Sequence, residues 1–120
     1  MGPGLMPMAA IVDYELTLSL PMRIAADTGI DALTHAIEAY VSRKANLFSD
    51  QQAIAAMKLI GQNLLRTCQD ATDLAAREAV MLGATLAGVA FSNASVALVH
   101  GISRPLGVHF HVVTPCCCLR

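Results

Sequence analysis

The run TGIDALTHAIEAYVS, residues 28–42, decides the fold. Its apolar side chains recur at the spacing of one helix face, and this predicts an amphipathic helix with one continuous apolar stripe. The stripe consists of Ala32, Leu33, Ala36, Ile37, Tyr40 and Val41.

Asp31 and His35 stand four residues apart on a neighbouring stripe of the same helix. Residues at this spacing lie one above the other, so the carboxylate and the imidazole can point at one divalent ion. Such a site needs further ligands from elsewhere in the chain. On spacing alone a second interpretation stays open, in which Thr28 caps an ordinary helix and Asp31 sits in its first turn.

The composition describes one modest domain. The chain has 120 residues, 55% of them hydrophobic and 4% aromatic, with no Trp, which predicts a core of small and aliphatic side chains. A net charge of -1 argues against a nucleic-acid binder, because phosphate neutralisation requires a basic surface. The cysteines, Cys68 and the run 116–118, make a poor disulfide framework, so we expect a reducing, cytoplasmic location.

Three further helices are expected after residue 42. Ser49 and Gln52 match a capping box for a helix over 50–68, in which Ile54, Met57, Ile60, Leu64 and Leu65 form the buried stripe. Thr72 is the expected N-cap of a third helix, in which Gly83, Ala87 and Gly88 suggest close packing. A fourth is expected from near Ser95 through His100 towards Gly107, weakened or kinked in its last turn by Pro105. The fold class is therefore all-α, a bundle of about four helices after a short extended N-terminal lead-in.

A charge-free run over 79–99 supports a competing hypothesis, a small membrane-associated or non-catalytic helical module. The cluster Ser92-Asn93-Ala94-Ser95 instead predicts a break between two helices. A helix buried in an all-α domain is apolar all round for the same reason as a spanning helix. We therefore favour a soluble bundle.

Three segments in the same order resemble the iron-containing (group III) alcohol dehydrogenase family. They are DYELTLSLP at 13–21, TGIDALTHAIEAYVS at 28–42 and VHGISRPLG at 99–107. The resemblance covers residues 8–112 and implies part of a dehydroquinate-synthase-like helical domain. It implies a lead-in and junction with a missing nucleotide-binding domain over 1–21, a partial helical metal-binding domain over 22–112, and a non-family tail over 113–120.

The same resemblance implies a site and a reaction. Asp31, His35 and His100 match metal ligands for Fe²⁺, or sometimes Zn²⁺, while Tyr14, Thr17 and Leu18 match a segment lying against NAD or NADP. The reaction is reversible hydride transfer between a small-molecule alcohol and NAD(P), with the metal polarising the alcohol oxygen. No Gly-rich phosphate-binding motif occurs, so we expect the chain to be inactive alone and to self-associate through exposed apolar surface.

The chain departs from the family twice. Arg104 stands where many members carry a histidine near the reacting alcohol, so no catalytic residue is assigned; His109 and His111 could serve there or could simply be solvated. A family histidine that is the fourth ligand is also missing after His111. We hypothesise a frame change, since a family-like Asn-Ala-Met-Leu-Leu-Pro-Ala coding run read one base later gives the Thr-Pro-Cys-Cys-Cys-Leu-Arg of 114–120. A zinc site made by Cys116–Cys118 with the two late histidines is the less favoured alternative.

Overall fold

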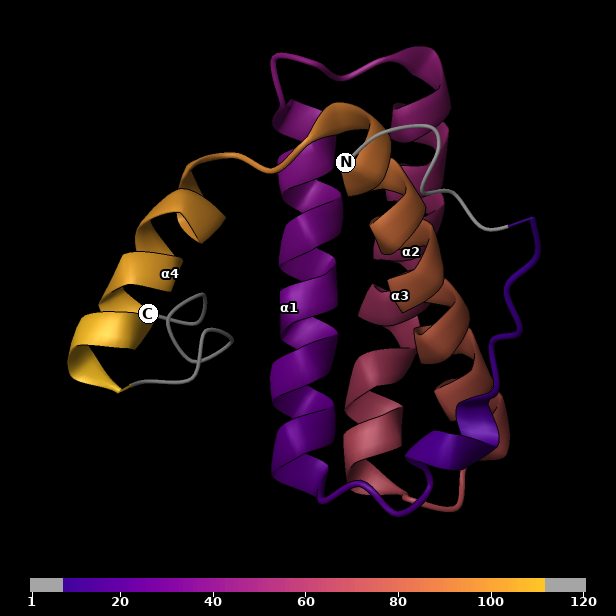
Figure 1. Cartoon of the computed structure of the whole chain (residues 1–120). Helices are drawn as coiled ribbons and strands as arrows, with labels where there is room; N and C mark the ends of the chain where they lie inside the picture. The colour runs from indigo at the N-terminus through magenta and orange to yellow at the C-terminus, as the bar shows by residue number, and fades with distance from the viewer. Residues whose placement is uncertain (1–7, 112–120) are drawn as a thin grey trace.

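The computed structural model describes residues 8–111, and these form helices without any strand (Figure 1). A short 3-10 helix, η2 (Tyr14–Thr17), precedes four α-helices. These are α1 (Met22–Val41), α2 (Leu47–Gln69), α3 (Leu74–Ala94) and α4 (Leu98–Phe110). The predicted all-α class with four helices is confirmed.

The first three α-helices pack side by side in an up-down-up arrangement, and α4 lies apart on the far side of α1 (Figure 1). Their core is built mainly of alanines. One cluster joins Ala36, Ala56 and Ala87, and a second joins Ala39, Ala53, Ala90 and Ala94, all at most 1% exposed. Such small side chains let the helix backbones approach closely, as the composition predicts.

The alternative in which Thr28 caps the first helix is wrong, and the second helix begins at Leu47 rather than at residue 50. α1 begins at Met22, and the Thr28 hydroxyl inside it donates to the Ile24 carbonyl at 2.7 Å, so Thr28 is no N-cap. The capping box of α2 is Asn46 with Ser49, whose side chains accept each other's backbone N–H at 3.1 and 2.9 Å. Asn46 takes the cap because it has the required extended backbone, which places Ser49 at the third helical position.

The later helix ends also differ from expectation. Asp73, not Thr72, caps α3, by accepting from the backbone N–H of Ala76 at 3.0 Å. The predicted break after α3 is present, since Ser95 has a φ of 66° in the left-handed region. α4 then starts at Leu98 and runs past Pro105 to Phe110, so it extends beyond the predicted stop at Gly107.

Large apolar side chains occupy less of the core than the sequence stripes suggest. Leu65, predicted to be buried, is 66% exposed, and Ile37, Tyr40 and Val41 of the first stripe are exposed as well. Alanines and glycines face the neighbouring helices in their place. Gly83 is one of them, because a Cβ there would lie 2.7 Å from Ile60 Cγ1; Gly88, also predicted to be close-packed, has nothing within 4 Å.

Within residues 8–111, only α3 is long and apolar enough to cross a membrane. This is a weak indication, because core helices of soluble proteins pass the same test. α3 packs against both α1 and α2 in the bundle. Its alanine-rich face supplies Ala87, Ala90 and Ala94 to the core.

Candidate metal centre

Two helices bring three potential ligands together. Asp31 and His35 lie on successive turns of α1, and His100 approaches them from the first turn of α4. One ligand atom from each residue lies within 4.8 Å of the others. His100 Nε2 is 3.4 Å from Asp31 Oδ1, and the two imidazole rings stack with centroids 3.8 Å apart. The sequence resemblance singled out the same three residues.

The hydrogen bond of His35 determines which of its ring nitrogens is free. Its Nδ1 lies 2.9 Å from the backbone carbonyl oxygen of Asp31. A carbonyl can only accept, so Nδ1 carries the proton and Nε2 keeps its lone pair. The Phe91 ring packs against this imidazole with a centroid separation of 4.6 Å and fixes its plane further.

Glu38 determines the orientation of His100 in the same way. Glu38 Oε2 lies 2.6 Å from His100 Nδ1, and both side chains are almost fully buried. Burial alone raises the pKa of Glu38, but hydrogen bonds from His100 and from the backbone N–H groups of Ala97 and Val99 outweigh it, so the pKa is lowered. The ionised carboxylate accepts from Nδ1–H, which leaves the His100 Nε2 lone pair facing Asp31.

Glu38 also holds the start of α4. Its second oxygen, Oε1, accepts the backbone N–H of Val99 at 2.6 Å. The N-cap residue of α4, Ala97, has no side chain that can do this. A carboxylate near a helix N-terminus is favoured by the exposed N–H groups and the helix dipole. One buried side chain therefore anchors α4 and orients its histidine.

Sequence analysis did not single out Glu38, although a signal was present. Residues at 31, 35 and 38 follow the helical spacing of one face, so Glu38 lies on the same side of α1 as Asp31 and His35. Its partner is 62 residues away along the chain. No local pattern could connect the two.

Burial favours the neutral form of the His35 imidazole. Burial lowers the pKa of His35, and the neighbouring His100 lowers it further, while Asp31 and Glu38 act in the opposite sense. The net pKa lies below the ordinary value of 6.5, so His35 is neutral near pH 7. Two imidazole nitrogens and one carboxylate oxygen suit Fe²⁺ or Zn²⁺, and a set of three protein ligands leaves room for a substrate oxygen.

The other predicted functional residues lie elsewhere. Tyr14 and Thr17 belong to η2 and Leu18 follows it, near α3 and on the opposite side of the bundle from α4 (Figure 1). Arg104 and His109 are exposed on α4, and His111 is exposed at its C-cap. The tail over 113–120, with its three cysteines, falls outside the described residues.

The chain is similar in structure and in sequence to several known proteins. The structure of sulfoacetaldehyde reductase from Bifidobacterium kashiwanohense in complex with NAD⁺ matches with a TM-score of 0.91 and 34% identity, over 97% of this chain and 31% of that one. Long-chain-alcohol dehydrogenase 1 of Geobacillus thermodenitrificans is 52% identical over 86% of this chain and 26% of its own length. The probable alcohol dehydrogenase EutG of Escherichia coli is 45% identical over 91% of this chain and 28% of its own length.

These likenesses define the class as a helical domain of the kind found in alcohol dehydrogenases. The chain belongs to the Fe-containing alcohol dehydrogenase family, whose C-terminal sequence model matches residues 25–118. The family resemblance noted from the three motifs is confirmed. The chain spans about a quarter of the length of these curated relatives.

Proposed function

We propose that this chain supplies the metal-binding part of an NAD(P)-dependent alcohol dehydrogenase. The family reaction is reversible hydride transfer between a small alcohol or its aldehyde and NAD or NADP. The observation that carries the proposal is the convergence of Asp31, His35 and His100 within 4.8 Å. A divalent ion held there, Fe²⁺ or Zn²⁺, would polarise the alcohol oxygen and so ease departure of the hydride.

Hydrogen bonds already hold both imidazoles in the orientation that metal binding would require. The Asp31 carbonyl and the Glu38 carboxylate hold the two Nδ1 protons, so both Nε2 atoms are free to bind. Asp31 supplies one negative charge, which leaves a divalent ion with net positive charge to act on the substrate. Phe91 beside His35 restricts the imidazole and keeps that flank apolar.

The cofactor half of the function is a separate part of the proposal. We assign Tyr14, Thr17 and Leu18 to contact with the nicotinamide cofactor, on family resemblance. Residues 1–21 would then be the junction with a nucleotide-binding domain, and 22–112 a partial metal-binding domain. Because these residues span only about a quarter of the curated relatives, we expect no turnover from the chain alone, and we place it in the cytoplasm.

Metal titration tests the proposal directly. Calorimetry with Zn²⁺, and Co²⁺ absorption as a spectroscopic stand-in for Fe²⁺, should show one site in the wild-type chain. Asp31→Ala, His35→Ala and His100→Ala should each abolish it. His109→Ala is the matched control, because His109 lies on the same helix as His100 but is exposed and outside the cluster. Unaltered binding in all three ligand variants would refute the metal site.

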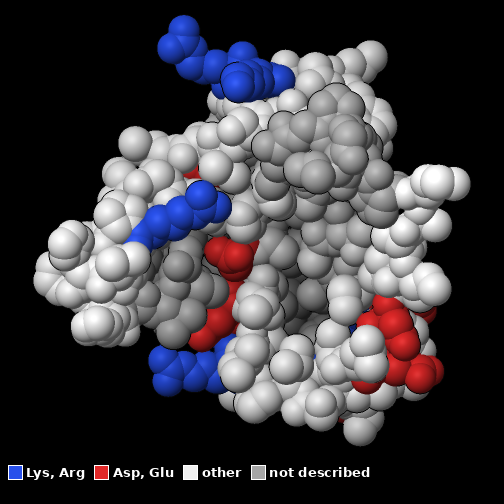
Figure 2. Space-filling model, in the orientation of Figure 1, with Lys and Arg blue, Asp and Glu red and all other residues white. Residues whose placement is uncertain are grey.

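A second candidate function rests on the exposed apolar side chains. α4 exposes several large apolar residues, and α1 exposes others near its C-terminal end: Leu98, Val99, Ile102, Leu106, Val108 and Phe110, with Ile37, Tyr40 and Val41. Charged side chains are sparse on the face shown in Figure 2. Large exposed apolar patches favour association, so the chain could act as a non-catalytic helical interaction module. Indifference to metal in the titration, together with tight self-association, would favour this function.

A further inference from the structure

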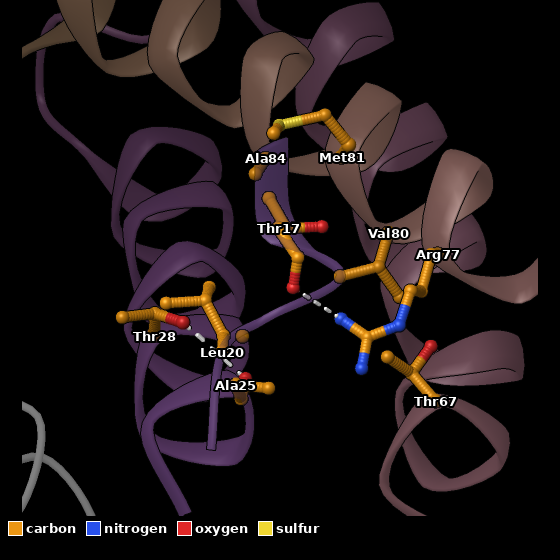
Figure 3. Close-up of a pocket in the computed structure, with 10 residues that line it drawn as sticks. Thr17, Leu20, Ala25, Thr28, Thr67, Arg77, Val80, Met81 and Ala84 are labelled. Carbon is orange, nitrogen blue, oxygen red and sulfur yellow. Dashed lines mark hydrogen bonds between the residues drawn. The ribbon is translucent and has the colours of Figure 1, made fainter. Parts of the chain in front are cut away.

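A cavity separate from the histidine cluster lies beside the first half of α1. It has a volume of about 210 Å³ and lies between η2, α1, α2 and α3 (Figure 3). α1 contributes Ala25, Thr28 and Gly29 to its wall. Asp31, His35 and His100 are not among the residues that line the cavity. A molecule in this cavity would not touch the candidate metal ligands.

The wall of the cavity is largely apolar, and Arg77 is the charged residue among those that line it. Leu20, Val80 and Met81 supply hydrocarbon surface. Three threonine hydroxyls also line the space, but each already donates to a backbone carbonyl within 3.0 Å: Thr17 to Tyr14, Thr28 to Ile24 and Thr67 to Asn63. None of these hydroxyls has a hydrogen left to donate to a ligand.

Arg77 is the exception. Its side chain is buried, with the residue only 4% exposed, and its guanidinium points from α3 into the space between Thr17 and Thr67 (Figure 3). Nη1 donates to the Thr17 carbonyl at 2.7 Å and Nε to the Ala71 carbonyl at 3.1 Å. These bonds tie η2 to the bundle, but they neutralise no charge.

In the described part of the chain, no carboxylate forms an ion pair with this buried cation. Among residues 8–111, none of the ion pairs includes Arg77, whereas the exposed Arg66 nearby pairs with Asp73 at 2.7 Å. A buried charge normally has an ionic partner, because leaving water without one is unfavourable. A guanidinium also offers further N–H groups in a planar fork that matches a carboxylate.

We propose that this cavity binds a short-chain carboxylate, with the carboxylate on Arg77 and the hydrocarbon chain against Leu20, Val80 and Met81. The volume sets the size, since cavities for drug-sized ligands hold roughly 300–1,000 Å³ and this one is smaller. The site is distinct from the proposed metal centre and does not depend on it.

The test uses hexanoate as the probe and 1-hexanol as its uncharged analogue, each titrated calorimetrically into the full chain. We expect saturable binding of hexanoate, and binding of hexanol weaker by about tenfold or more, because the charged hydrogen bond is lost. Arg77→Gln should reduce hexanoate affinity to the level of hexanol. Arg66→Gln, which removes an exposed arginine outside the cavity, should leave it unchanged.

Ala84→Leu provides a second test that keeps the arginine. Ala84 lines the cavity, so the larger side chain should fill it and abolish hexanoate binding while circular dichroism shows intact helices. This variant decides the question if Arg77→Gln does not fold. Three outcomes would overturn the proposal: equal affinity for hexanoate and hexanol, full binding by Ala84→Leu, or displacement of hexanoate by NAD⁺, which would assign the cavity to the cofactor.

Discussion

His100 Nδ1 lies 2.6 Å from Glu38 Oε2, and this buried contact joins α4 to α1 at the candidate metal centre. The same carboxylate accepts the backbone N–H of Val99 at 2.6 Å. The position of the His100 imidazole and the start of α4 therefore both depend on the Glu38 side chain. Removing or altering that side chain should affect both.

Glu38→Gln should weaken metal binding by roughly 10- to 100-fold, the usual effect of losing a partner that orients a ligand. A glutamine amide can donate to His100 Nδ1, which would move the imidazole proton to Nε2 and block the atom that binds metal. Calorimetric titration with Zn²⁺ measures the affinity, and ¹⁵N NMR of the metal-free protein reports the tautomer.

Glu78→Gln is the control for this variant, because Glu78 is an exposed glutamate on α3. It should change neither the affinity nor the His100 tautomer. If Glu38→Gln binds Zn²⁺ as tightly as the wild type, with Nδ1 of His100 still protonated, the orienting role of Glu38 is wrong.

The helices, and the three residues that cluster at the candidate metal centre, could be predicted from the sequence because both leave local traces. Apolar periodicity gave the number of helices, and the family motifs gave Asp31, His35 and His100. Helix starts were less accurate, since the cap depends on backbone angles that several neighbouring polar residues could adopt, as Asn46 and Ser49 illustrate.

Contacts between distant segments left no such trace. Glu38 lies on the predicted face of α1, but its acceptor role requires α4 to fold back against it. Arg77 likewise bonds to Thr17, which is 60 residues away. The exposure of Leu65 also depends on how the neighbouring helices pack, and the stripe alone carried no information on that packing.

Acid should destabilise the metal-free chain in two stages. The pKa of His35 is lowered, chiefly by burial, so its contribution to stability is complete above the ordinary value of 6.5 and declines as the pH falls below it. The pKa of Glu38 is also lowered, so its contribution persists above 4.5 and is lost as the pH falls through the folded-state pKa. Thermal unfolding between pH 8 and pH 3 measures both stages.

His35→Gln separates the two stages of this profile. It removes the titrating imidazole, so the decline that begins near pH 6.5 should shrink while the acidic stage remains. Glu38→Gln should have the opposite effect and flatten the acidic stage. A wild-type melting temperature that rises on acidification from pH 7 to pH 5 would contradict the assigned directions.

Self-association should be measurable and should involve the apolar surface of α1 and α4. Val41 and Val108 are 65% and 74% exposed, and their burial in an interface would remove apolar surface from water. Light scattering coupled to gel filtration should show species larger than a monomer, and Val41→Lys with Val108→Lys should shift them towards the monomer. Gln51→Lys, an exposed polar position on α2, is the control. A compact monomer across concentrations would contradict the prediction.

Gly83→Ala and Gly88→Ala should have opposite effects on stability, although both glycines lie in α3. A Cβ at Gly83 would lie 2.7 Å from Ile60 Cγ1 and 3.3 Å from the Ala56 carbonyl oxygen, so α2 and α3 would have to separate. Overpacking of this kind costs about 1–3 kcal/mol. A Cβ at Gly88 meets nothing within 4 Å, so alanine there should stabilise the helix by roughly 0.5–1 kcal/mol.

Urea denaturation followed by circular dichroism measures both changes in the free energy of unfolding. The pair is internally controlled, because each variant adds the same methyl group to the same helix and the two differ only in what that group meets. Helix propensity alone would stabilise both variants. A stabilised Gly83→Ala would therefore mean that α2 and α3 do not approach as closely as the structure shows.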